Sequence, residues 1–386
     1  MQLALTAEEA AFREELRTFY TTQIPEELRE AVRRGAPVTK DLIVTSHKIL
    51  NEHGLAVPNW PVEWGGKDWT PTQYQIWTDE MQLACVPEPL NFNVKMVGPV
   101  IAEFGSQEIK ERFLPPTASI DIWWCQGFSE PEAGSDLASL RTTAVRDGDS
   151  YVVNGQKTWT TLGQYADWIF CLVRTDPQAP KRQAGISFVL IDMATPGITL
   201  RPIKTIDGGR EINEVFFEDV RVPANQLVGE ENQGWTYAKF LLANERTGIA
   251  GVGRTKVRLA EVKKHAIQTG LLDDPLFAAR LAEAENEVLA LELTQSRVTT
   301  DSAGGKPNPA SSVLKLRGSQ LQQAATELLV EIAGPDALPF GAGDATASPE
   351  WAQRSAPTYL NYRKFSIFGG TNEVQRNIIA STILGL

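Results

Sequence analysis

The sequence is poor in the residue types that bind metals or form disulfides. Its 386 residues include only 3 cysteines and 3 histidines. The cysteines, Cys85, Cys125 and Cys171, are odd in number and far apart, which argues against a disulfide framework and against a thiolate metal site. So few histidines weaken a zinc site further. We therefore expect no metal.

Long apolar segments and runs of positive charge are also missing. No apolar run reaches membrane-spanning length, and residues 1–19 contain six charged side chains, which is incompatible with the apolar core of a signal peptide. Lys and Arg total 37 against 48 Asp and Glu, a net charge of −11, without a basic cluster. We therefore expect a cytoplasmic protein without membrane insertion or a nucleic-acid partner.

The residues that are present suit a soluble globular chain of two or three domains, with 42% hydrophobic and 22% charged residues. Near the N-terminus, Thr6 and Glu9 form a capping box, and apolar residues then recur at helical spacing. Helical patterns continue to Leu114, where Pro115 and Pro116 end them. The sequence thus predicts an N-terminal helical domain over residues 1–117.

Short alternating runs separated by turn signals follow this helical part. Asp147-Gly148 and Asn154-Gly155 are dipeptides typical of tight turns between strands. We therefore expect a β-domain over residues 118–229. The predicted strands are 142–146, 150–153, 157–161, 168–174, 185–192 and 215–222.

Helical periodicity returns after Gly234 and continues almost to the C-terminus. Four long patterns predict a four-helix bundle over residues 230–386. Residues 335–356 contain several Pro and Gly without a period, which predicts a surface loop inside the bundle. The predicted fold class is therefore α+β. The four helical patterns are 235–268, 275–302, 309–333 and 357–384.

Two motifs in the predicted β-domain say most about function. Residues 127–136 (GFSEPEAGSD) form a loop rich in backbone N–H groups and hydroxyls, suited to lie against a flat, hydrogen-bonding ring. Residues 154–161 (NGQKTWTT) add an indole flanked by hydroxyls. Together they resemble the flavin site of acyl-CoA dehydrogenases. Further blocks follow the order of that family, at 104–106, 114–115, 217–223 and 369–376, so the resemblance covers nearly the whole chain.

The resemblance implies a fold and a reaction. The fold has an N-terminal helical domain, a middle β-barrel or sandwich domain and a C-terminal four-helix bundle. The reaction is FAD-dependent α,β-dehydrogenation of an acyl-CoA to the trans-2-enoyl-CoA, with electrons passed to an electron-transfer flavoprotein. Such a reaction needs a base for the α-proton, a hydride acceptor, which is the flavin, and donors that stabilise the enolate.

The position of the base departs from the commonest pattern in the family. Many members have a Glu directly before the Gly-Thr of the C-terminal block, whereas this chain has Gly369 there. Other members place the carboxylate on the first long bundle helix before an Arg, which corresponds to Glu245-Arg246. Apolar neighbours favour burial of Glu245, which would raise its pKa toward that of a useful base. The alternative for Glu245 is a half-exposed helix acid.

Other residues receive roles from the same resemblance. The backbone N–H of Gly369 would polarise the thioester carbonyl, although Gly-Gly-Thr-Asn is otherwise typical of a turn. Ser129, Trp159 and Thr161 would contact the flavin ring; the alternative for each is a loop cap or a core aromatic. Thr371 and Glu373 would bind the phosphate and adenosine end of FAD. Ser135 and Arg246 would bind the CoA substrate.

Two departures from the family's sequence pattern concern the assembly of subunits. The family's Arg-Phe-Gly block, which reaches the flavin of a neighbouring subunit, is replaced by residues 269–275 (TGLLDDP), and a Gly-Gly pair is replaced by Gly334-Pro335, where Pro removes a donor. This pattern predicts a homo- or hetero-oligomer, with a homologous second subunit in the hetero-oligomeric case. There are two alternatives to the dehydrogenase. One is a non-catalytic partner subunit, and the other is a flavin oxidase or monooxygenase on the same fold. The presence of Glu245 favours the dehydrogenase over both.

Overall fold

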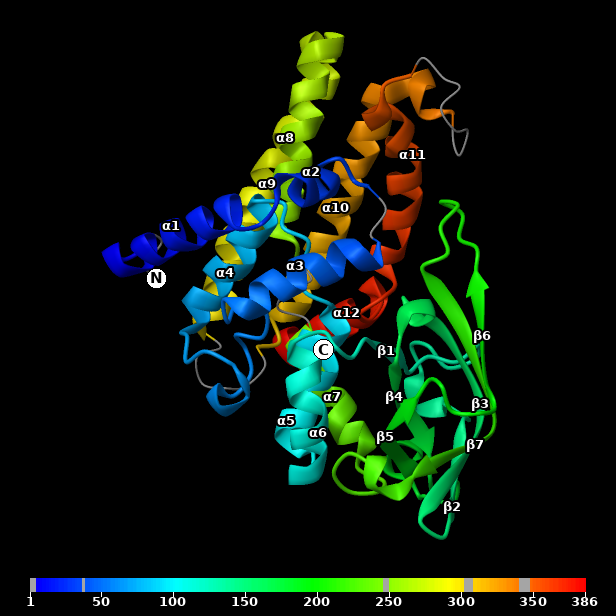
Figure 1. The fold of residues 1–386 in the computed structure, drawn as a ribbon. Coiled ribbons are helices and arrows are strands. Elements are labelled where there is room, and N and C mark those ends of the chain that lie inside the picture. The colour runs from blue at the N-terminus through cyan, green and yellow to red at the C-terminus, as the bar shows by residue number, and fades with distance from the viewer. Residues whose placement is uncertain (1–4, 37–38, 246–249, 302–307, 340–347) are drawn as a thin grey trace.

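The computed structural model describes residues 5–36, 39–245, 250–301, 308–339 and 348–386, without the side chains of 243–245 and 300–301. In chain order these residues form a group of helices, a sheet and a second group of helices (Figure 1). The predicted α+β class with helical, β and helical parts is therefore confirmed.

The N-terminal helices begin with the predicted capping box. The Thr6 hydroxyl accepts from the Glu9 backbone N–H at 3.2 Å, and the Glu9 carboxylate accepts from the Thr6 N–H at 2.8 Å. Pro115 and Pro116 lie inside the last helix, which continues to Ala118. The helices are α1 (Ala7–Thr22), α2 (Glu26–Arg33), α3 (Lys40–Glu52), α4 (Pro71–Leu83), the π-helical η2 (Phe92–Val97), α5 (Gly98–Phe104) and α6 (Gln107–Ala118).

The middle part is a seven-stranded sheet with the order β1-β4-β2-β3-β7-β6 and with β5 paired to β4. The predicted strand 168–174 is confirmed as β4, but the predicted turn at Asn154-Gly155 is wrong. Gly155 instead lies in a bulge within one continuous strand, because its φ of 148° absorbs the register shift against β7. The strands are β1 (Trp124–Gly127), β2 (Thr143–Asp147), β3 (Ser150–Thr161), β4 (Trp168–Arg174), β5 (Ile186–Asp192), β6 (Ile198–Ile203) and β7 (Ile212–Pro223).

The four-helix bundle is also present, with different first and last helices from those predicted. The pattern 235–268 is not one helix, because Gly251 has a φ of 62° and a separate helix starts after it. The pattern 357–384 is interrupted at Gly369 and Gly370, whose φ angles of 64° and 83° are left-handed. The bundle helices are α8 (Val252–Thr269), α9 (Pro275–Asp301), α10 (Ser311–Ala333) and α11 (Glu350–Tyr362), so the predicted loop 335–356 is shorter.

Helix α7 (Gly234–Glu245) packs between the first helices and the sheet rather than inside the bundle (Figure 1). It packs mainly against β5 and η2 and also contacts α5 and β4. The Tyr237 ring lies 4.4 Å from the Phe104 ring, and its hydroxyl accepts from the Glu230 N–H at 2.9 Å. One continuous apolar core therefore joins the N-terminal helices, α7 and the inner face of the sheet.

Among the described residues, no helix is long and apolar enough to cross a bilayer. No group of three or more His, Cys, Asp or Glu side chains in these parts of the chain is arranged to hold a metal ion. The three cysteines are all buried and free.

Candidate active site

The two motifs singled out in the sequence lie side by side in the structure. The Thr158 N–H in β3 donates to the Ser129 carbonyl at 2.9 Å. The Lys157 ammonium donates to the Phe128 carbonyl at 3.2 Å and to the Glu130 carboxylate at 2.7 Å. The loop after β1 is thereby held against β3.

The Lys157–Glu130 pair is almost fully buried, with side-chain exposures of 0% and 8%. The same carboxylate accepts from the backbone N–H groups of Arg141 at 2.6 Å and Thr142 at 2.9 Å. Burial disfavours the charged form of Glu130, but Lys157 and these donors outweigh it and lower its pKa. The sequence analysis missed this pair. The sequence showed only a lysine at the start of the predicted strand 157–161, which does not by itself indicate burial.

Trp159 is turned out of the sheet by a second irregularity in β3. Its φ is 60°, and the register against β7 shifts between Lys157 and Thr160. The flanking Thr158 and Thr160 are buried, whereas Trp159 is 58% exposed. A large aromatic exposed at a strained backbone position is typical of functional sites, and this bulge leaves the indole available to cover a flat ligand.

Two hydroxyls close to Trp159 have spare hydrogen-bonding capacity. Within the described part of the chain, the Ser129 hydroxyl has no hydrogen-bond partner. The Thr161 hydroxyl contacts only the Trp159 carbonyl, at 3.5 Å, which is long for a hydrogen bond. Ser135 is exposed in the same loop as Ser129. These groups can therefore receive a polar ligand without breaking strong internal bonds.

The end of β3 is connected to the C-terminal segment through Glu211. The Leu162 N–H, directly after Thr161, donates to the Glu211 carbonyl at 2.6 Å. The Glu211 carboxylate accepts from the Asn361 amide at 3.0 Å and pairs with Lys364. The segment that leads into Gly369 is therefore anchored beside the strand that carries Trp159.

Gly369 and Gly370 form a left-handed turn before the short helix α12 (Asn372–Ile378). The Gln375 amide donates to the Gly369 carbonyl at 3.2 Å and fixes this turn. The Gly369 N–H has no acceptor among the described residues. Thr371 caps α12 by accepting from the Val374 N–H at 3.2 Å, and its hydroxyl also hydrogen-bonds to the Glu373 carboxylate, which contributes to lowering the pKa of Glu373.

Glu373 and the base candidate are placed less completely. Glu373 is exposed and pairs with Arg376 at 3.2 Å. Glu245 is the last residue of α7, which corrects the expectation that it lies on the first bundle helix. Its side chain, and the whole of Arg246, lie outside the described residues.

Comparison with known proteins settles the family. Models of the N-terminal, middle and C-terminal domains of acyl-CoA dehydrogenase match residues 6–121, 125–220 and 232–384. The chain belongs to the acyl-CoA dehydrogenase family. As a member of this family of flavoproteins, it is an oxidoreductase. The exposed Trp159 lies within the residues that match the middle-domain model.

This acyl-CoA dehydrogenase is similar along its full length to bacterial relatives. It is 34% identical over 383 residues to the acyl-CoA dehydrogenase IpdE1 of Mycobacterium tuberculosis, covering 97% of each chain. Among solved structures, the ChsE4-ChsE5 complex from Mycobacterium tuberculosis superposes with a TM-score of 0.85 at 34% identity, covering 100% of this chain and 99% of that chain. The Tcur3481-Tcur3483 steroid acyl-CoA dehydrogenase gives a TM-score of 0.87 at 30% identity, with coverage of 100% and 99%.

Proposed function

We propose that this acyl-CoA dehydrogenase removes hydrogen across the α,β bond of an acyl-CoA with FAD as cofactor, and passes the electrons to an electron-transfer flavoprotein. The observation that carries the proposal is the β3 bulge. It holds the Trp159 indole outward, beside the loop of Ser129 and beside Thr161. When bound, FAD supplies the acceptor for the hydride from the substrate's β-carbon.

The donor set of this face fits an isoalloxazine ring. Trp159 offers an apolar wall, and the hydroxyls of Ser129 and Thr161 can bond the polar edge of the ring. At the other end of the cofactor, Thr371 is the proposed donor to a phosphate oxygen, for which its hydroxyl would have to exchange the Glu373 carboxylate for the phosphate. Glu373 is unfavourable near a pyrophosphate, but its pairing with Arg376 at 3.2 Å offsets its charge.

In the proposed mechanism Glu245 removes the α-proton. The Gly369 N–H donates to the thioester carbonyl and stabilises the enolate that forms, which is the role of an oxyanion-hole donor. Because Gly369 lacks a side chain, space remains between this turn and the substrate for a carboxylate from another element. Ser135 and Arg246 are assigned to the CoA part of the substrate.

We further propose a bulky acyl group and a heteromeric assembly. The two solved structures above bear titles that name a steroid acyl-CoA dehydrogenase and a complex of two chains. The heteromeric assembly also agrees with the absence of the neighbour-reaching Arg in residues 269–275. The same absence favours the second candidate function, a non-catalytic partner subunit.

The test is to purify the protein with any co-purifying partner and to titrate it, without oxygen, with straight-chain, dicarboxylic and steroid-derived acyl-CoAs. The proposal expects a yellow protein whose flavin bleaches with one of these classes. Colourless protein that cannot be reconstituted with FAD would contradict it. Bleaching that depends on the partner chain alone would assign the non-catalytic role.

A further inference from the structure

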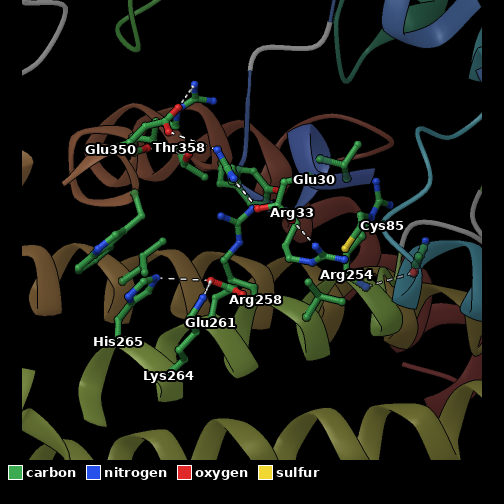
Figure 2. A pocket seen from close by; sticks show the side chains of 18 residues that line it. Glu30, Arg33, Cys85, Arg254, Arg258, Glu261, Lys264, His265, Glu350 and Thr358 are labelled. Atoms are coloured by element: carbon green, nitrogen blue, oxygen red, sulfur yellow. Dashed lines mark hydrogen bonds and ion pairs between the residues drawn. The ribbon is translucent and has the colours of Figure 1, made fainter. Parts of the chain in front are cut away.

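A cavity of about 360 Å³ lies between α2, α8 and α11, where the N-terminal helices meet the bundle (Figure 2). None of the residues that line it belongs to the proposed flavin site. Six cationic side chains line this cavity against three carboxylates, Glu30, Glu261 and Glu350. The excess of positive charge is unexpected in a chain whose net charge is −11. The cations are Arg33, Arg34, Arg254, Arg258, Lys264 and Arg354.

The three carboxylates are each shared. Glu30 pairs with Arg33 and with Arg34, the latter at 2.6 Å. Glu350 pairs with Arg354 at 2.6 Å and lies 3.7 Å from Arg34. Glu261 lies 3.7 Å from Lys264 and 3.4 Å from the ring of His265. Arg254 finds its partner outside the lining, in Glu88 at 3.3 Å. The lining carboxylates therefore do not neutralise the cavity.

Arg258 has no carboxylate partner among the described residues. Its guanidinium lies 5.5 Å from the centre of the Tyr362 ring. Its Nη1 atom and the Thr358 hydroxyl both lie 3.7 Å from the position that a Cβ atom would take at Gly35, just after α2. Arg258 therefore reaches from α8 toward the end of α2 and toward α11 (Figure 2).

Two further guanidinium groups at this cavity have buried donors without acceptors. The Arg254 Nε and the Arg354 Nη1 atoms are both buried and have no hydrogen-bond partner among the described residues. A buried donor on a charged group is costly when it is left unpaired. Guanidinium groups whose donors are left unpaired keep the wall of the cavity positive, and an anion in the cavity would offset that charge.

We propose that this cavity binds a small molecule that carries a phosphate or pyrophosphate group. Arg33 comes from α2, Arg254 and Arg258 from α8, and Arg354 from α11, so donors converge from three directions. A tetrahedral phosphate presents oxygens on several sides and suits this arrangement better than a flat carboxylate, and guanidinium groups bind it with charge-assisted hydrogen bonds. The volume lies within the usual range for small-ligand sites. The bound ligand ties the N-terminal helices to the bundle.

The experiment is calorimetric titration of the full chain, with its partner if one co-purifies, with pyrophosphate at constant ionic strength. Inorganic phosphate and ADP distinguish a bare phosphate group from a nucleotide, and citrate represents carboxylates. We expect saturable binding of pyrophosphate or ADP that is tighter than binding of citrate. The absence of saturable binding, or tighter binding of citrate, would overturn the proposal.

Arg258→Gln is the test variant, because Arg258 has no ion pair whose loss would disturb the fold. Its affinity for pyrophosphate should fall at least about tenfold, as expected for the loss of one charge-assisted contact. The control is Lys263→Gln on the same helix, since Lys263 pairs with Glu285 at 3.0 Å outside the cavity. Pyrophosphate should raise the melting temperature of the wild type and of the control but not of Arg258→Gln. Equal binding by Arg258→Gln would show that the cavity is not the site.

Discussion

Two regions of the chain that bear on flavin binding differ in how well they are equipped for it. The sheet end, formed by the loop 127–136 and by β3, has an exposed indole, hydroxyls with spare hydrogens and a buried Lys157–Glu130 pair that holds loop and strand together. The second region, the bundle end, consists of the bundle termini at 269–275 and 334–338, which in the family arrangement would face the cofactor of a neighbouring subunit.

The bundle end has the wrong chemistry for a phosphate group. It contains Asp273, Asp274 and Asp336 but no Arg or Lys, and Pro335 has no N–H to donate. Two leucines beside these turns, Leu276 and Leu338, are 76% and 77% exposed. The groups at the sheet end therefore suit the proposed flavin ring, whereas the bundle termini suit an apolar contact better than an anion.

The largest effect should come from removing the proposed base, Glu245, at the end of α7. Glu245→Gln should keep the flavin but slow its reduction by acyl-CoA by at least ~10²-fold, the lower end of what a general base contributes. Stopped-flow reduction measures this rate, and Glu230→Gln, in the loop before α7, is the control. Persistent fast reduction would place the base elsewhere. Partial recovery in the double variant Glu245→Gly with Gly369→Glu would indicate that both positions face one α-carbon.

Breaking the buried Lys157–Glu130 pair should destabilise the sheet end. Lys157→Met leaves the Glu130 carboxylate buried without its partner, which should lower the free energy of unfolding by about 3–5 kcal/mol. Urea unfolding measures the change. Arg221→Met is the matched control, because its pair with Asp147 in the same sheet is 60% exposed on both sides and should contribute less than about 1 kcal/mol. Equal effects of the two variants would refute the role assigned to Lys157.

Trp159→Ala should separate ligand binding from stability. Loss of ring stacking, worth about 0.5–1.5 kcal/mol, should lower the affinity for FAD up to roughly tenfold. The free energy of unfolding should change little, because the indole is exposed. Flavin fluorescence on dilution reports the affinity. Leu338→Ala, at the bundle end, should leave the FAD affinity of the isolated chain unchanged. A large loss of stability in Trp159→Ala would instead mean that the indole belongs to the core.

The smallest expected effect is a pH dependence at the sheet end. Because the pKa of Glu130 is lowered in the folded chain, its stabilising contribution is present above the pKa of an unfolded Glu and is lost as the pH falls through the folded value. Urea midpoints from neutral to acidic pH should therefore fall more steeply in the wild type than in the double variant Glu130→Gln with Lys157→Met. Parallel pH profiles would contradict this prediction.

Local signals in the sequence predicted local structure well. The capping box of Thr6 and Glu9 and the strand 168–174 were confirmed because they depend on neighbouring residues and on alternation. The continuous β3 was missed because its Asn154-Gly155 bulge is decided by pairing with β7. The break before α8 was missed because apolar periodicity continues through it.

The candidate site was predictable as a set of motifs but not as a geometry. The sequence placed Ser129 and Trp159 in one site by resemblance, yet the contact that joins their segments, from Thr158 to Ser129, depends on the folded sheet. Lys157 and Glu130 are 27 residues apart, so no local pattern could pair them. The cationic cavity was invisible for the same reason, since it gathers arginines from three helices.

The contrast between the two ends is tested most directly by counting FAD per chain, with the protein expressed alone and together with a homologous chain that carries an Arg-Phe-Gly block. A pyrophosphate without that Arg loses a charge-assisted contact worth roughly 1.5–3 kcal/mol, about one to two decades in affinity. The chain alone should therefore bind FAD substoichiometrically, and mass measurement with flavin quantification should show a heteromer of higher occupancy after co-expression. A stable homotetramer that holds one FAD tightly in every chain would contradict this account.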